Sequence, residues 1–390
     1  MHVLIAPSGY KECLEADRVA VAIERGVRAA SPDFEIRCLP LVDGGEGFAE
    51  GMAVATGGKI HGVEVTGPVG EQVKAVLGEL GNATTPTFAV EMAQAAGLRL
   101  VPRDLRNPMR TTTRGVGELI KTALDHGARR IVVGCGDSGT SDGGAGMAQA
   151  LGCRLLDERD EPIAPGAEGL LTLASIDCSD RDPRLDEVEI EAALNITVML
   201  CGERGVARVF GPQKGADEAM IESMERALEN YASVIARDCR VDVANLPGGG
   251  ASGGLGAGLA ALAGARLKSR YDVILPHFDL DRHLDWADLV FTAEGGIDLQ
   301  TPRGKIPVEV ARRAKLRSLP VIALAGQVDA RARIVYEHGI DAYFSTTVRP
   351  ETMEAAMAEA EDTLALAAEN VMRAIVVSSR CPALQLRTTS

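Results

Sequence analysis

The chain has no excess of positive charge and no apolar run long enough to span a bilayer. Its 390 residues carry 41 Lys and Arg against 55 Asp and Glu, which gives a formal net charge of −14. Nucleic acids and anionic membranes attract basic surfaces, so we expect neither as a partner. The N-terminal MHVLIAPSGYKE is too short in apolar length for a signal peptide. We therefore expect a soluble, cytoplasmic protein.

Paired cysteine motifs are also absent. The sequence has no CxxC and no cysteine and histidine pair at zinc-binding spacing, although it contains eight cysteines. Scattered cysteines of this kind are typical of reduced thiols in a cytosolic enzyme rather than of a disulfide framework. The eight are Cys13, Cys38, Cys135, Cys153, Cys178, Cys201, Cys239 and Cys381.

Strand and helix patterns alternate at both ends of the chain. The apolar run 2–7 precedes an amphipathic stretch at 15–30 and a second strand pattern that ends in LVDGG. Near the C-terminus, strands are expected at 288–296, 320–326 and 340–346, with helices at 308–317, 330–339 and 351–377. This βαβ order predicts parallel sheets and therefore an α/β fold.

The middle of the chain is richer in glycine and in short strands. We therefore predict two domains: a Rossmann-like α/β domain from residues 1–66 and 285–378, and an α/β domain inserted between them at 67–284. Residues 379–390 show no periodicity, and we expect them to form a flexible tail.

Two glycine-rich segments follow strand patterns and lead into helices made of small residues. The first glycine loop is GCGDSGTSDGGAG, residues 134–146, and the second glycine loop is PGGGASGGLGAG, residues 247–258. Glycine lets a backbone approach a phosphate, and a helix N-terminus favours an anion. Glycine also simply permits tight turns and close packing. Neither loop matches a Walker A motif or a Rossmann fingerprint in its usual place, but two such loops in one chain favour phosphate chemistry.

Further segments carry a resemblance to a known family. IAPSGYKE (5–12), LVDGGEG (41–47), TGPVGE (66–71), TTRGVGELI (112–120), SDGGAGMAQALG (141–152), FGPQKGA (210–216) and GKIPVEVA (304–311) resemble, in order and spacing, the type I glycerate kinases. The resemblance covers about residues 1–375. It implies a Rossmann-like domain from both chain ends, an inserted α/β domain, and an active site between them. It also implies phosphoryl transfer from ATP with Mg²⁺ to a small hydroxy acid, and it leaves a homodimer open.

Several residues in these motifs could carry the chemistry. Phosphoryl transfer requires cations near the phosphates, a metal and an oriented hydroxyl. Lysines beside glycines could supply the cations, although most lysines are merely solvated. Carboxylates beside glycines are often turn caps, but some could bind Mg²⁺ or take the hydroxyl proton. We expect catalytic roles for Lys11, Asp43, Lys214, Glu294 and Asp298, with Asp43 and Asp298 as metal ligands. We expect ATP contacts from Ser138, Thr140, Ser141, Asp142, Gly143, Gly253 and Gly254, and substrate contacts from Ser8, Arg114, Asn195 and Lys305.

The chain departs from the family pattern in some of these motifs. Asn195 stands where the family has aspartate, and Gly296 stands where it has arginine. Asparagine cannot accept a proton at neutral pH. Three readings therefore stay open: a kinase acting on glycerate or a related 2-hydroxy acid, a paralogue with a larger acceptor or other chemistry, and a catalytically impaired binding protein.

Overall fold

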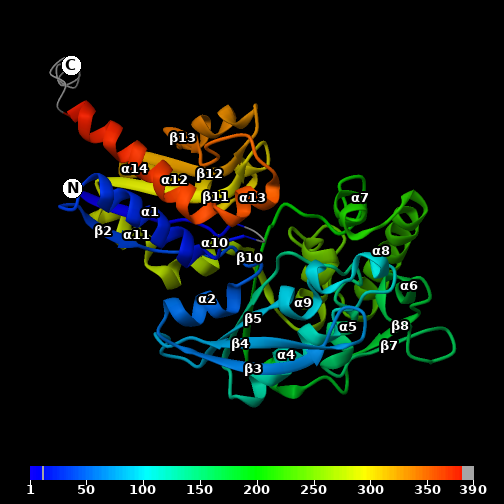
Figure 1. The fold of residues 1–390 in the computed structure, drawn as a ribbon. Coiled ribbons are helices and arrows are strands. Elements are labelled where there is room, and N and C mark those ends of the chain that lie inside the picture. Colours follow the sequence, from blue (N-terminus) through cyan, green and yellow to red (C-terminus); the bar gives the residue numbers. More distant parts are fainter. Residues whose placement is uncertain (11–12, 380–390) are drawn as a thin grey trace. The chain divides into compact units, whose positions relative to one another are not determined.

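The computed structural model describes residues 1–10 and 13–379. The chain forms two compact units (Figure 1): unit 1 contains Met1–Val42 and the chain from Phe278 onward, and unit 2 contains Asp43–His277. The sequence-based division placed the boundaries at 66/67 and 284/285. The first boundary differs because the strand at residues 59–66 pairs inside the sheet of unit 2. The predicted flexible tail lies, from residue 380 on, outside the described residues.

Unit 1 is built on a five-stranded parallel sheet in the order β13-β12-β11-β1-β2. β1 is central between strands from opposite ends of the sequence, because Val3 faces Leu289 of β11 on one side and Ile36 of β2 on the other. Both chain ends therefore contribute to one sheet, as predicted. The strands are β1 (His2–Ile5), β2 (Glu35–Cys38), β11 (Leu289–Ile297), β12 (Val321–Val328) and β13 (Ala342–Ser345).

One face of this sheet is covered by two helices that lie side by side (Figure 1). α1 (Ala16–Ala30) buries Val19, Ile23 and Val27, a spacing of four residues that forms one apolar stripe. This stripe shares a core with Leu364 and Met372 of α14. The other helices of unit 1 are α11 (Leu280–Trp286), α12 (Ile306–Lys315), α13 (Met353–Ala358) and α14 (Ala360–Ser379), with 3₁₀ turns η6 (Thr301–Arg303) and η7 (Ala332–His338).

Two helix predictions in unit 1 need correction. The segment predicted as a helix at 330–339 is the 3₁₀ helix η7, which ends at Gly339 with φ of +93°. The helix predicted at 351–377 is divided into α13 and α14 at Glu359, whose φ and ψ of −99° and 3° leave the helical range. Local patterns predicted helical character here but not the tighter turn or the break.

Unit 2 contains a six-stranded mixed sheet in the order β10-β9-β6-β5-β4-β3. β3 and β4 form an antiparallel hairpin, whereas β5, β6, β9 and β10 are mutually parallel. The strands are β3 (Lys59–Thr66), β4 (Gln72–Glu79), β5 (Thr87–Glu91), β6 (Arg130–Gly134), β9 (Glu189–Leu194) and β10 (Arg266–Ser269). The predicted α/β class is confirmed in both units.

Helices of unit 2 surround two apolar cores. One core lies between the sheet and α3, α4 and α9, and the other lies between α5, α6, α8 and a small two-stranded sheet. The helices are α2 (Phe48–Ala55), α3 (Met92–Ala96), α4 (Arg114–Asp125), α5 (Ala145–Ala150), α6 (Gly166–Leu170), α7 (Val206–Phe210), α8 (Glu218–Asp238), α9 (Ala251–Leu262) and α10 (Arg270–Ile274). The 3₁₀ turns are η1 (Leu98–Leu100), η2 (Arg103–Leu105), η3 (Pro183–Asp186), η4 (Pro212–Lys214) and η5 (Leu275–Phe278).

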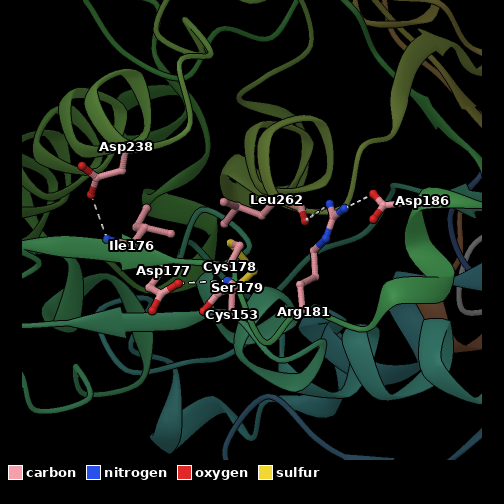
Figure 2. The surroundings of a disulfide bond; sticks show 9 residues. All are labelled: Cys153, Ile176, Asp177, Cys178, Ser179, Arg181, Asp186, Asp238 and Leu262. Atoms are coloured by element: carbon pink, nitrogen blue, oxygen red, sulfur yellow. Dashed lines mark hydrogen bonds and ion pairs between the residues drawn. A yellow bond between two sulfur atoms is a disulfide. The ribbon is translucent and has the colours of Figure 1, made fainter.

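The small sheet carries a disulfide bond between Cys153 and Cys178 (Figure 2). Its strands β7 (Arg154–Leu156) and β8 (Ser175–Asp177) are antiparallel, with Arg154 facing Asp177. The next pair outward in this register is Cys153 and Cys178, whose Cα atoms are 4.3 Å apart. The expectation that all eight cysteines are reduced is therefore wrong for these two, because strand pairing across 25 residues brings them together.

Neighbouring contacts attach the β8 side of this small sheet to two helices (Figure 2). The carboxylate of Asp238, at the end of α8, accepts a hydrogen bond of 2.9 Å from the amide of Ile176. Arg181 donates to the carbonyl of Leu262 at the end of α9 over 3.2 Å.

Among the described residues, no helix is long and apolar enough to cross a membrane.

We expect the disulfide to contribute about 3 kcal/mol to the free energy of unfolding. The reason is that it closes a loop in the unfolded chain and so lowers the conformational entropy of that chain. Urea unfolding of the oxidised protein, the reduced protein and Cys153→Ser measures this difference. Cys239→Ser is the control, since it removes a thiol from the same unit without breaking a bond. Equal stability of the oxidised and reduced forms would contradict the assignment.

Candidate active site

In unit 1 the direction of strand order reverses between β1 and β11. From β1 the chain passes through α1 to β2 on one side, and from β11 it passes through α12 to β12 on the other. In open parallel sheets, ligands bind outside the carboxyl ends of the strands at such a switch point. The loops after β1 and β11, which contain several of the predicted residues, lie at this point.

A lysine and two carboxylates meet at the carboxyl end of β11. Lys305 Nζ lies 3.0 Å from Glu294 Oε1 and 3.7 Å from Asp298 Oδ1, and it donates to the carbonyl of Gly296 over 3.3 Å. Asp298 Oδ1 also accepts from the amides of Gln300 (2.7 Å) and Thr301 (3.1 Å), so it caps the turn that follows. The structure thus brings three predicted residues together around one ammonium group.

The loop after β1 is tied to the same strand. Ser8 donates from both its amide and its hydroxyl to the carbonyl of Ala293, each over 2.9 Å. Tyr10 is buried beside Glu294; burial is the main cause that raises the pKa of its hydroxyl well above the usual value. Lys11, predicted to be catalytic, lies outside the described residues.

In unit 2 the carboxyl ends of the four parallel strands collect a second set of charged residues. Arg270 follows the end of β10, and its Nη1 lies 3.3 Å from both the carbonyl and Oδ2 of Asp43. Asp43 Oδ1 in turn accepts from the amide of Gly45 over 3.1 Å. Arg270 also stacks over the ring of Tyr271, 5.1 Å from its centroid. The predicted Asp43 is therefore paired with an arginine of its own unit.

Two further carboxylates accept hydrogen bonds at this edge of the unit 2 sheet. Asp137 Oδ2 accepts from the amide of Glu46 over 3.2 Å. Glu91, the last residue of β5, is buried and accepts from the amides of Gly47 (3.2 Å) and Ala49 (3.1 Å) at the start of α2. Burial raises the pKa of Glu91 to about 7, although these hydrogen bonds act in the opposite direction. Glu91 thus fixes the segment that carries Asp43.

The two glycine loops pack directly against each other inside unit 2. Gly143 donates from its amide to the carbonyl of Gly253 over 3.0 Å. Gly253 has a φ of +72°, and a Cβ there would collide with the carbonyl of Thr140. Ser252, Gly253 and Gly254 all have positive φ, so regular α9 geometry begins only after them. Mutual backbone packing therefore accounts for much of the glycine content.

Most of the residues predicted to bind ATP lie inside this packed region. Ser138, Thr140, Ser141, Asp142, Gly143, Gly253 and Gly254 are all buried. Asp142 accepts four hydrogen bonds of 2.8 to 3.2 Å, from the amide and hydroxyl of Thr113 and the amides of Gly144 and Gly146. Burial nevertheless raises its pKa. The part of the first loop that reaches the surface contains Gly136 and Asp137.

Lys214 lies inside the same region rather than at a surface. It is 2% exposed, and its Nζ donates to Ser138 Oγ (3.0 Å) and to the carbonyl of Thr140 (2.6 Å). Burial lowers its pKa to about 7, and the nearby charge of Asp142 acts in the opposite direction. In this structure Lys214 fixes the path of the first glycine loop, and its catalytic role stays a prediction.

Two predicted substrate residues have local partners. Asn195 Oδ1 accepts from the amide (3.1 Å) and hydroxyl (2.8 Å) of Thr197, which makes a turn at the end of β9. Arg114, at the first turn of α4, is exposed and lies 3.2 Å from Glu118. Asn195 lies at the carboxyl edge of the sheet, whereas Arg114 begins a helix.

Across residues 1–10 and 13–379, no group of three or more His, Cys, Asp and Glu side chains is arranged to hold a metal ion. Mg²⁺ nevertheless binds through one or two carboxylates, together with waters and substrate phosphates. Asp43 and Asp298 each contact a cationic side chain and backbone amides. Because a carboxylate has about four acceptor positions, these contacts leave each of them compatible with binding a magnesium ion.

The model of the glycerate kinase family matches residues 3–376, nearly the whole chain. The chain belongs to the glycerate kinase family. It is 45% identical to glycerate 2-kinase of Escherichia coli K12 over 380 residues, which covers 97% of this chain and 99% of that protein. It is 44% identical to glycerate kinase of Bacillus subtilis 168 over 375 residues, or 96% of this chain and 98% of that protein.

The fold of the family is also seen in a solved structure. A crystal structure from Salmonella typhimurium LT2, described as a proposed glycerate kinase 2, is 47% identical and superimposes with a TM-score of 0.82. The match covers 97% of this chain and 99% of that chain. The predicted resemblance and the predicted fold class are therefore confirmed.

Sequence reasoning within the family motifs missed three residues of the unit 2 edge. Glu91 ends the apolar strand pattern TFAVE, and Arg270 directly follows the short strand RLKS, which is not apolar. The position at a strand end was the available signal for Glu91. Asp137 lies inside the first glycine loop, three residues after β6 ends at Gly134, and directly before the hydroxyl and glycine residues for which ATP contacts were predicted. A search for charged residues at or shortly after the strand ends would have included all three.

We expect Lys214→Met to change how stability depends on pH. Because the pKa of Lys214 falls to about 7 on folding, the unfolded chain binds one more proton than the folded chain between about pH 7 and 10. Relative to the variant, the wild type should gain up to about 1.4 kcal/mol per pH unit between about pH 7 and 9.

Urea unfolding of both proteins at several pH values in this range measures that difference. Lys59→Met, at an exposed position of the same unit, is the matched control. A constant difference between the wild type and Lys214→Met would show that Lys214 keeps an ordinary pKa.

Proposed function

We propose that this chain is a glycerate kinase that transfers the γ-phosphoryl group of ATP to a hydroxyl of D-glycerate. The observation that carries the proposal is the family match over residues 3–376, with relatives named glycerate kinase that are matched over nearly their full length. Because the Escherichia coli relative is named glycerate 2-kinase, we propose 2-phosphoglycerate as the product. A cytoplasmic location and a homodimer stay predictions.

Two cations among the described residues support the proposal. Phosphoryl transfer depends mainly on positioning and on neutralising phosphate charge. In a chain with a net charge of −14, an anionic substrate requires local cations. Lys305 provides one at the switch point of unit 1, where Glu294 and Asp298 orient its ammonium group. Arg270 provides another at the strand ends of unit 2.

A carboxylate is needed to receive the proton that leaves the acceptor hydroxyl. Asp43, Glu294 and Asp298 are the candidates. Glu294 and Asp298 lie at the carboxyl end of β11 or directly after it, and Asp43 lies against Arg270, which follows β10. Asp43 or Asp298 would hold Mg²⁺, and the bound ion would supply positive charge to neutralise the phosphates. The lysine and arginine would then orient the remaining anionic groups.

The first test is ADP release from ATP and Mg²⁺ with D-glycerate. We expect turnover by the wild type and a fall in kcat of about 100-fold for Lys305→Met, because one preorganised cation at the transferring group is lost. Lys74→Met, on the exposed side of β4, should keep wild-type rates. Wild-type rates in Lys305→Met would exclude Lys305 from the site.

A second experiment separates glycerate from a different acceptor. The double variant Asn195→Asp, Gly296→Arg restores the residues that the family pattern has at these positions. The structure accommodates a side chain at 296, since a Cβ there would have Gln327 O as its nearest neighbour at 3.8 Å. If the wild type acts on glycerate, we expect the double variant to change KM rather than to create activity. Activity in the variant alone would indicate that the natural acceptor is another hydroxy acid.

A further inference from the structure

Arg270 begins α10 directly after β10, at the carboxyl end of that strand. Its side chain is 18% exposed and lies against Asp43, and the following Tyr271 stacks on the guanidinium. Burial by itself lowers the pKa of Arg270, but Tyr271, Asp43 and Asp137 act in the opposite direction and leave the pKa raised. The guanidinium is therefore held as a permanent positive charge beyond the carboxyl end of β10.

Asp137 occupies a backbone conformation that disfavours its own side chain. Its φ is +51°, in the left-handed region that non-glycine residues rarely adopt. Aspartate tolerates this region better than most residues, but glycine would adopt it without a penalty. Strained residues of this kind persist where surrounding structure holds them, and they concentrate at functional sites.

In this conformation the carboxylate of Asp137 lies close to Asp43. Gly45 lies between the two side chains: a Cβ at Gly45 would be 3.1 Å from Asp43 Oδ1 and would collide with Asp137 Oδ2. Asp137 Oδ2 also accepts the amide of Glu46, so it orders the segment that carries Asp43. The two carboxylates therefore flank one glycine, and both act electrostatically on Arg270.

We propose that Asp137 is a positioning residue that, with Asp43, orients the Arg270 guanidinium to bind an oxyanion of the substrate. A guanidinium carries five N–H donors in a planar fork, so it can contact carboxylates of the protein and an additional oxyanion at once. The oxyanion is either the carboxylate of the hydroxy acid or a phosphate of the nucleotide. This inference rests on the proposed kinase function and assigns it two residues that the sequence analysis did not select.

Four variants test the proposal. Arg270→Gln removes the cation and keeps an amide. Asp137→Asn removes the carboxylate charge and keeps a residue that tolerates positive φ, whereas Asp137→Gly removes the charge and relieves the strain. Asp160→Gly is the matched control, because Asp160 has a φ of +58° in an exposed turn between β7 and β8.

For each variant, kcat, KM for D-glycerate, KM for ATP and Tm are measured. We expect Arg270→Gln to raise one KM about tenfold or more, because a charge-assisted contact with the substrate is lost. Both Asp137 variants should raise the same KM by a smaller factor, while Asp137→Gly and Asp160→Gly keep or raise Tm. Asp160→Gly should leave both KM values unchanged. A rise in KM for glycerate identifies the carboxylate, and a rise in KM for ATP identifies a phosphate.

Other outcomes overturn the proposal. Both KM values within about twofold of wild type in Arg270→Gln would show that Arg270 does not contact substrate. A lower Tm for Asp137→Gly with unchanged KM values would show that Asp137 is structural only. Calorimetric titration of D-glycerate and of ADP into the wild type and Arg270→Gln gives a readout without turnover. Failure of the kinase proposal itself appears separately, as absence of wild-type turnover.

Discussion

The close contact between the two glycine loops is the constraint on which unit 2 depends. The amide of Gly143 reaches the carbonyl of Gly253, and no side chain could be inserted at Gly253. Asp142 and Lys214 then pair with several polar groups that this contact buries, among them the amide of Thr113 and the carbonyl of Thr140. The contact fixes where α5 and α9 begin, and hence how they cover their cores. The two loops thus pack against each other inside unit 2, and the segment around Asp137 is the part of the first loop that reaches the surface.

In both units, charged side chains lie close together at the carboxyl ends of parallel strands. Parallel strands end at one edge, so residues that are distant in sequence converge there. In unit 1 this edge gathers Glu294 and Lys305, and in unit 2 it gathers Asp43 and Arg270. A strongly acidic chain can thus present isolated cations whose orientation is set by the carboxylates beside them. This arrangement suits recognition of an anionic substrate by geometry rather than by overall charge.

The sequence predicted what local patterns and family motifs can encode. Alternating strand and helix patterns gave the parallel sheet shared by both chain ends, and the motifs gave the family. Features that depend on contacts between residues far apart in the sequence were not predicted. The disulfide depends on the pairing of β7 with β8, and the burial of Lys214 depends on a loop more than 70 residues away. Arg270 lies in no motif, so only its place after β10 in the folded sheet reveals it. Within regular elements, the break at Glu359 follows from backbone geometry that helical periodicity does not report.

The central position of β1 has a consequence for biosynthesis. β1 is made first, yet one of its two neighbours, β11, begins only at Leu289. All strands of unit 2 lie between these two points in the sequence. During synthesis, unit 2 can therefore complete its sheet while β1 and β2 still lack β11, and unit 1 closes last through contacts of very high sequence separation. The order of emergence from the ribosome thus allows the inserted unit to fold before unit 1.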